Sequence, residues 1–131
     1  MNVWENEAWA AHEHAREAGI EDFRYLKEAA DKLRLIYAQF CTSRERPYGR
    51  LGIETCAAIS HPPDYNPETE KIIDVNHATS RRVLIQTEAP MRGLPTVLQT
   101  SQYVLLKVAG KWRVDSKRYM CDDGTSIPNV L

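Results

Sequence analysis

Apolar and small residues in the first third of the chain recur at the spacing of α-helices. After Trp4 the small residues follow at steps of three and four, and Gly19 is placed to end this helix or to allow a bend. A second helix is expected from about Asp22 to Cys41, where six residues keep alternating steps of three and four: Phe23, Leu26, Ala30, Leu33, Tyr37 and Phe40. These six side chains lie along one side of the helix, so that side must face an apolar partner.

The pattern changes to strands after "TSRERPYGRLG", where Pro47 and two glycines prevent a helix from continuing. Strands are expected at residues 51–60, 71–78 and 81–89, with a loop at 61–70. Residues 90–100 interrupt the strands again, residues 103–120 supply the last two strands, and 121–131 form a short tail. The connections between the later strands are too short for crossover helices, so the sheet is expected to be antiparallel. Helices followed by antiparallel strands indicate an α+β fold in which the helical stripe covers one face of the sheet.

The stretch "YVLLKVAGKWRVDSKRYM" (103–120) reads as a hairpin with two possible registers. A two-residue turn at Gly110-Lys111 mixes Lys107 into the apolar face. A three-residue loop ending in a left-handed Gly110 pairs Leu106 with Trp112 instead. We favour this second register, which predicts a positive φ at Gly110, four inward residues (Val104, Leu106, Trp112 and Val114) and three outward ones (Arg113, Asp115 and Lys117).

Composition bounds the class of protein. The 131 residues, 43% hydrophobic and 27% charged, are typical of one soluble domain, about 1–41 helical and about 50–120 mainly strands. The first residues contain no unbroken apolar run, so neither a signal peptide nor a membrane span is expected. Three widely spaced cysteines without a zinc pattern fit a reducing compartment, and we expect a cytoplasmic protein.

Charge is unevenly distributed, although the net charge is only −1. Residues 1–31 contain eight acids and three bases, whereas the 103–120 stretch is rich in lysine and arginine. Separated surface charge of this kind is usually a solvated face. The pI of about 6.4 and the interspersed acids argue against nucleic-acid binding, with the basic face of the hairpin as the one candidate patch.

Candidate groups for chemistry are few. An enzyme would need an acid–base pair, for which His61, His77, Tyr37 and Asp115 are the candidates; packing or exposed surface is the favoured interpretation of each of them. His12 and His14 diverge on a helix and cannot chelate one ion together. The sequence contains no phosphate-binding glycine loop. We therefore expect no catalytic, cofactor-binding or metal-binding residues.

Three segments in the last two thirds of the chain resemble a known family. "FCTSRERPYGRLG", "PPDYNPETEKIIDV" and "YVLLKVAGKWRVDSKRYMCDDGT" occur in this order, at similar spacing, in the nuclear transport factor 2-like immunity proteins of bacterial polymorphic toxin systems. The resemblance covers roughly residues 40–131. Two segments depart from it: "EAPMRGLPTVLQT" is longer and richer in proline and leucine, and the acidic N-terminal helix matches no motif.

The resemblance implies a cone-like fold, with N-terminal helices packed on a strongly bent antiparallel sheet. It also implies a non-enzymatic immunity protein, a monomer or homodimer that binds and neutralises a cognate toxin domain; a nuclease or another cytoplasm-acting effector is the expected target. The alternative is a small cone-fold enzyme or ligand-binding protein of the isomerase or dehydratase kind that uses the sheet cavity. A water-filled pocket in which His61, Tyr37 or Asp115 converge would favour the alternative.

Two surfaces are candidates for the toxin contact. The positive groove of a nuclease would fit an acidic surface, so the first candidate comprises exposed acids of the first helices, namely Glu5, Glu13, Glu17, Glu21 and Asp22. The second comprises residues of the family motifs, namely Tyr48, Arg50, Asp64, Tyr65, Asn66 and Glu68. These motif residues could equally serve to hold the loop and the start of the sheet.

Overall fold

The computed structural model describes residues 2–20, 24–46, 49–51 and 57–129. They belong to two compact units. The helical unit comprises Met1–Gln39 and Glu45–Asn66, and the sheet unit comprises Phe40–Arg44 and Pro67–Leu131. Each unit is described by itself below.

The first helix of the helical unit, α1 (Asn2–Glu17), ends where the sequence predicts. Gly19 has a φ of 63°, and the N–H groups of Gly19 and Ile20 donate to the carbonyls of Arg16 and Ala15. These two bonds and the left-handed glycine form a Schellman motif, which satisfies carbonyls that the helix itself leaves unpaired. The prediction that Gly19 ends the helix is confirmed.

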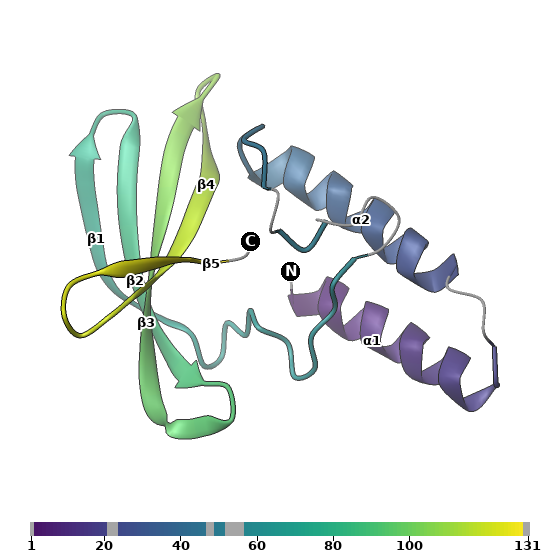
Figure 1. Cartoon of the computed structure of the whole chain (residues 1–131). Coiled ribbons are helices and arrows are strands. Elements are labelled where there is room, and N and C mark those ends of the chain that lie inside the picture. The colour runs from purple at the N-terminus through teal and green to yellow at the C-terminus, as the bar shows by residue number, and fades with distance from the viewer. Residues whose placement is uncertain (1, 21–23, 47–48, 52–56, 130–131) are drawn as a thin grey trace. The chain divides into compact units, whose positions relative to one another are not determined.

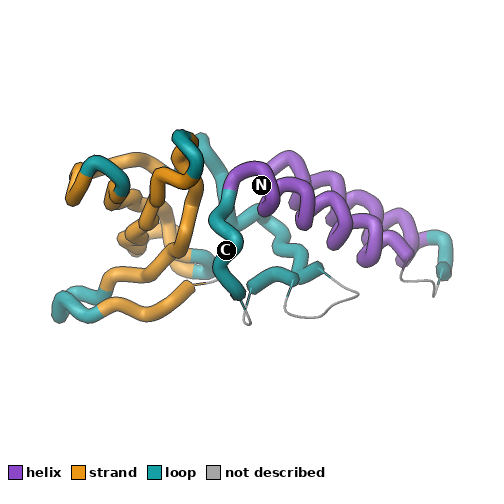
Figure 2. Tube along the Cα trace, turned by 90° about the horizontal axis from the view of Figure 1, so that it is seen from above, coloured by secondary structure: helices purple, strands orange, loops and turns teal. Residues whose placement is uncertain are grey.

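The second helix, α2 (Arg24–Phe40), lies beside α1 in both Figure 1 and Figure 2. Ala8 of α1 and Ala29 and Ala30 of α2 are buried in one cluster with Trp4 and Leu33. Small side chains at these positions let two helices approach closely, and the indole N–H of Trp4 donates to the carbonyl of Ala29 at 2.8 Å. Burial of Ala30 and Leu33 confirms the middle of the predicted stripe; Phe40 at its end is 54% exposed, and Phe23 lies outside the described residues.

The sheet unit contains five antiparallel strands in the order β1-β2-β3-β4-β5 (Figure 1). The strands are β1 (Lys71–Thr79), β2 (Arg82–Met91), β3 (Leu94–Val108), β4 (Lys111–Met120) and β5 (Ser126–Asn129). Each strand pairs with the next one along the chain, and the sheet does not close on itself. Two helices followed by an antiparallel sheet confirm the predicted α+β class.

Three predictions for segments after residue 50 are wrong. In the expected strand at 51–60, Leu51 lies in a turn and residues 57–60 form no strand, while residues 52–56 lie outside the described residues. The expected tail contains the edge strand β5, which pairs with β4. The expected interruption at 90–100 is instead the end of β2, a turn at Arg92-Gly93 and the start of β3.

The prolines in this last segment are tolerated because of where they lie in the sheet. The β1–β2 pairing extends only to Glu88, so Pro90 of β2 lies beyond it. The β3–β4 pairing starts at Ser101, so Pro95 of β3 also lies beyond the doubly paired part of the strand. A strand with an open side can accept a residue that lacks the N–H donor.

The predicted register of the β3–β4 hairpin is wrong, although the positive φ of Gly110 is confirmed at 80°. The turn consists of Ala109 and Gly110, both with positive φ, so that Lys107 pairs with Trp112. Positive φ at both central residues defines a type I′ turn, whose twist matches that of the flanking strands. A β-bulge follows in β4, because Leu105 pairs with Val114 while Val104 pairs with Ser116.

This register changes which side chains are buried. Val104 is buried as predicted, but Trp112, expected in the core, is 42% exposed. Lys117, expected in solvent, is only 6% exposed, and the side chain of Asp115 is also largely buried. A one-residue change in pairing moves side chains to the opposite face of a strand. The bulge shifts the pairing of β4 a second time, and the alternation of apolar and polar residues in the sequence does not show this shift.

Among the described residues, no helix is both long and apolar enough to cross a membrane.

Candidate functional site

Arg50 is the centre of a buried polar cluster in the helical unit. One of its terminal nitrogens lies 2.6 Å from a carboxylate oxygen of Glu5 in α1 and 2.6 Å from one of Asp64. Its other terminal nitrogen donates to the carbonyl of Ala58 at 3.1 Å, and its backbone carbonyl accepts from the N–H of the same residue. Arg50 therefore joins α1 to the segment that contains Ala58 and Asp64.

Aromatic rings flank the same guanidinium. Its central carbon lies 5.9 Å from the ring centre of Trp4 and 5.5 Å from that of Tyr65. Cation–π contacts of this kind strengthen when the cation is removed from water, and Arg50 is 4% exposed. Burial raises the pKa of the Tyr65 hydroxyl well above its usual value, and the nearby Arg50 cation opposes that shift only in part. Tyr65 is thus a packing residue, with its phenol kept protonated.

Glu5 was expected on an exposed acidic face, and this is wrong: it is completely buried. Besides Arg50, it accepts the backbone N–H groups of Asp64 and Tyr65, both at 3.4 Å. The carboxylate therefore neutralises the arginine and fixes the loop. Its position next to Trp4, at the border of the apolar stripe of α1, is the sequence signal that could have indicated this burial.

The other expected contact residues have different surroundings. Glu13 is half-buried and paired with Arg16 at 2.8 Å, which lowers the pKa of its carboxyl group, while Glu17 is exposed. Glu21, Asp22 and Tyr48 lie outside the described residues. Asp64 keeps a 42% exposed side chain although it contacts Arg50, Asn66 is half-buried and Glu68 is exposed. Among the described residues, the structure therefore brings together four of the expected residues in one cluster, namely Glu5 from the first candidate surface and Arg50, Asp64 and Tyr65 from the second.

A second polar cluster, in the sheet unit, escaped prediction. One carboxylate oxygen of Glu70 accepts the hydroxyl of Thr87 at 2.7 Å and that of Tyr103 at 2.8 Å, and it lies 3.8 Å from the ammonium of Lys117. The same ammonium lies over the ring of Tyr103 at 5.0 Å. Glu70 directly precedes β1, so these contacts fix the start of the first strand to side chains of β2, β3 and β4. The bulge in β4 changes the face of the sheet on which Lys117 lies, and the sequence does not show where this bulge occurs.

A third cluster joins the loop at 61–66 to α1. The rings of Trp9 and His61 stack with centroids 4.7 Å apart and planes 10° from parallel. His12 lies beside Trp9, and its Nδ1 is 2.9 Å from the hydroxyl of Tyr25. These contacts explain His61 and His12 as residues that hold the loop and the two helices together.

Two of the remaining candidates for chemistry, Tyr37 and Asp115, also have structural partners. Tyr37 packs against the helical core, with the guanidinium of Arg46 5.7 Å from its ring centre. Asp115 accepts the hydroxyl of Thr42 and pairs with Arg44 at 3.1 Å, which holds residues 41–44 against β4. His77 is exposed on β1. Within the described ranges no three His, Cys, Asp or Glu side chains are arranged to hold a metal ion.

Comparison with protein families gives one result that covers both units. A family model described as NTF2 fold immunity protein matches residues 1–127. The matched range includes the acidic N-terminal helix and the 90–100 segment, the two parts that seemed to depart from the family. Curated proteins and solved structures give no significant match.

Proposed function

The chain belongs to the NTF2 fold immunity protein family, and we propose on that premise that it binds a cognate toxin domain and neutralises it by protein–protein contact. The observation that carries this proposal is the extent of the match. It spans residues 1–127, and thus α1, the Arg50 cluster and strands β1 to β4 together. The likeness therefore concerns the whole architecture and not a short motif that unrelated proteins could share.

The surroundings of the polar residues support binding over chemistry. The candidate acids and bases of the enzyme alternative are engaged in packing or in contacts that hold loops: His61 on Trp9, Tyr37 in the helical core, and Asp115 with Thr42 and Arg44. Neutralisation of a protein by binding needs shape, aromatic or arginine anchors and complementary charge, without any reacting group. The chain has exposed arginine and lysine side chains and an exposed tryptophan that could serve in this way.

A toxin that acts in the cytoplasm is the partner that fits this proposal. The immunity protein then protects the cell that makes the toxin, or a neighbouring cell that receives it, by forming a tight complex in the same compartment. The complex must live longer than the time in which an unbound toxin would damage the cell. Slow dissociation is therefore the kinetic property expected of the complex.

Co-expression tests the proposed function directly. The chain and the toxin domain encoded beside it are expressed from separate inducible promoters, with an unrelated soluble protein of similar size as the control in place of the chain. We expect growth arrest by the toxin alone, growth in the presence of the chain, and co-purification of the two proteins in a stable complex. Persistent growth arrest while the chain is soluble and abundant would contradict the proposal.

A further inference from the structure

Two turns lie side by side at one end of the sheet (Figure 1). Ser80 and Arg81 connect β1 to β2, and Ala109 and Gly110 connect β3 to β4. The backbone N–H of Lys107 donates to the carbonyl of Arg81 at 2.9 Å, which ties the two turns together. We call this region, residues 79–84 and 104–114, the basic end of the sheet.

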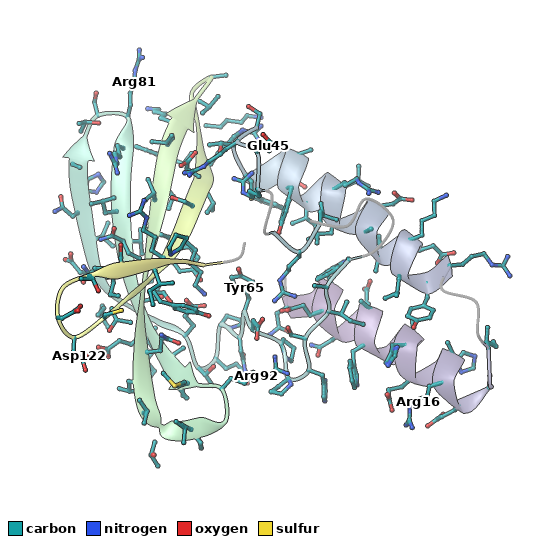
Figure 3. All side chains as sticks on the ribbon, viewed as in Figure 1. Arg16, Glu45, Tyr65, Arg81, Arg92 and Asp122 are labelled. Atoms are coloured by element: carbon teal, nitrogen blue, oxygen red, sulfur yellow. The ribbon has the colours of Figure 1, made fainter. Side chains whose placement is uncertain are left out.

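The basic end contains five bases and no acid: Arg81, Arg82, Lys107, Lys111 and Arg113. Four of them are exposed, and Arg81 extends away from the strands in Figure 3. Arg113 is half-buried and donates to the carbonyl of Cys41. The next acid along the chain, Asp115, is already paired with Arg44. Residues 79–84 and 104–114 therefore contain no carboxylate of their own that could neutralise these bases.

An aromatic anchor lies among these bases. Trp112 is 42% exposed and Val108 is 44% exposed, and the ammonium of Lys107 lies 5.8 Å from the ring centre of Trp112. Tryptophan and arginine are the residue types that most often dominate the energetics of protein interfaces. An exposed tryptophan with a lysine beside its ring provides apolar contact area together with charge that selects the partner.

The acids of the helices form a weaker candidate for the contact. Glu13 pairs with Arg16 at 2.8 Å and Glu7 with Lys32 at 3.2 Å, and Asp31 pairs with Arg34. Each of these carboxylates has a base beside it, so the field that a partner would experience is reduced. Among the described residues, the four exposed bases of the basic end, Arg81, Arg82, Lys107 and Lys111, form no ion pair with a carboxylate.

We propose that the basic end of the sheet is the surface that contacts the toxin domain, and that it fits an acidic patch on that domain with Trp112 as an aromatic anchor. This inference rests on the proposed function and names the contact surface for it. An acidic protein surface suits the chain better than nucleic acid does, because the whole chain has a net charge of −1 and a pI of about 6.4. The basic end supplies local attraction, and the acidic remainder of the chain disfavours binding along a phosphate backbone.

Charge reversal at exposed positions tests the surface. The variant R81E/K111E changes two bases of the basic end, and K27E/K32E makes the same change in charge on exposed positions of α2. E13K/E17K tests the acidic face of α1 in the same assay. The probe is the purified toxin domain encoded beside the chain, with binding measured at about 50 and about 300 mM NaCl, since screening separates charge effects from packing.

We expect R81E/K111E to bind the toxin domain about tenfold or more weakly at low salt, mainly through slower association, and K27E/K32E to stay within about twofold of the unaltered chain. Replacement of Trp112 by alanine should weaken binding at both salt concentrations, because the loss is one of packing. Circular dichroism and thermal unfolding of every variant confirm that the fold persists.

Several results would overturn the inference. Unchanged toxin binding by R81E/K111E would do so, as would a loss confined to E13K/E17K. The surface would instead be assigned to nucleic acid if the chain bound a labelled duplex of about 20 base pairs at about 150 mM salt, R81E/K111E weakened that binding, and toxin binding stayed unchanged. Absence of any complex with the unaltered chain would count against the proposed function itself, which keeps the two failures apart.

Discussion

Arg50 and Glu5 form an ion pair with a nitrogen–oxygen distance of 2.6 Å, and both side chains are almost completely buried. The two residues are 45 positions apart in the chain, and they join α1 to the segment that leads to Asp64 and Tyr65. Removal of two charges from water is costly, and the attraction between them offsets that cost only while both partners are present. The pair is therefore best understood as a device that specifies how these segments pack.

Replacement of Glu5 by glutamine should leave Arg50 as a buried cation with only the half-exposed Asp64 as its acidic partner. We expect the free energy of unfolding to fall by about 3 kcal/mol, in the range found when one partner of a buried pair is removed. Urea unfolding followed by circular dichroism measures the change. The matched control is Glu7→Gln, which breaks the exposed pair with Lys32 and should change the stability by less than about 1 kcal/mol. Equal effects of the two substitutions would show that the Glu5 pair has no special role.

Lys117 and Lys111 provide a second matched comparison, because they lie on the same strand with opposite burial. Lys117 is 6% exposed beside Glu70, whereas Lys111 is exposed at the turn. Lys117→Met should lower the free energy of unfolding by about 1 to 3 kcal/mol, since Glu70 then remains largely buried without a cation. Lys111→Met should stay within about 0.5 kcal/mol. An unchanged free energy of unfolding in Lys117→Met would mean that the hydroxyls of Thr87 and Tyr103 alone satisfy Glu70.

The turn between β3 and β4 can be stabilised by one substitution. Ala109 has a φ of 49°, in the left-handed region that an alanine adopts only at a cost of roughly 1 kcal/mol. Ala109→Gly should therefore raise the free energy of unfolding by about 0.5 kcal/mol, because relief of strain exceeds the added flexibility of the unfolded chain. Thermal unfolding detects the shift, and Gly110→Ala, at a φ of 80°, should move the midpoint in the opposite direction. A loss of stability in Ala109→Gly would contradict the type I′ assignment.

Tyr65 predicts how stability changes at alkaline pH. Its pKa in the folded chain is raised by burial, while the unfolded chain ionises near the usual value of about 10. The unfolded state therefore loses this proton first as the pH rises, so the folded state is progressively destabilised above about pH 10. Below that pH both states hold the proton, so Tyr65 adds nothing to the pH dependence of the free energy of unfolding. Urea unfolding between about pH 9 and 11 should show a smaller decline for Tyr65→Phe than for the unaltered chain; parallel declines would refute the assignment.

Much of the architecture could be predicted from local sequence. The helical spacing of Ala30 and Leu33, the stop at Gly19 and the turn between β1 and β2 depend on residues a few positions apart, and each is confirmed. The prolines at 90 and 95 misled the interpretation, because their effect depends on whether a neighbouring strand extends that far. The sequence alone does not show where such a neighbour ends.

The candidate sites were predicted less well than the elements that contain them. Arg50, Asp64 and Tyr65 were singled out in one group with Tyr48, Asn66 and Glu68, and the structure places these first three in the buried cluster. Glu5 was assigned to solvent because its charge favours exposure, and its partner lies far along the chain. Trp112 and Lys117 were exchanged between core and surface because the turn at Ala109 and the bulge at Asp115 each shift the alternation of β4.

By itself, the sequence determined the class of this protein: helices from their apolar spacing, strands from their composition, and an immunity-protein family from three ordered motifs. Tertiary structure alone decided which charges are buried and which are available to a partner. The physical reason is that burial of a charge depends on a compensating group from a distant segment, as Glu5 finds in Arg50 and Lys117 in Glu70. The exposure of the basic end follows in the same way, since residues 79–84 and 104–114 contain no acid that could neutralise its bases.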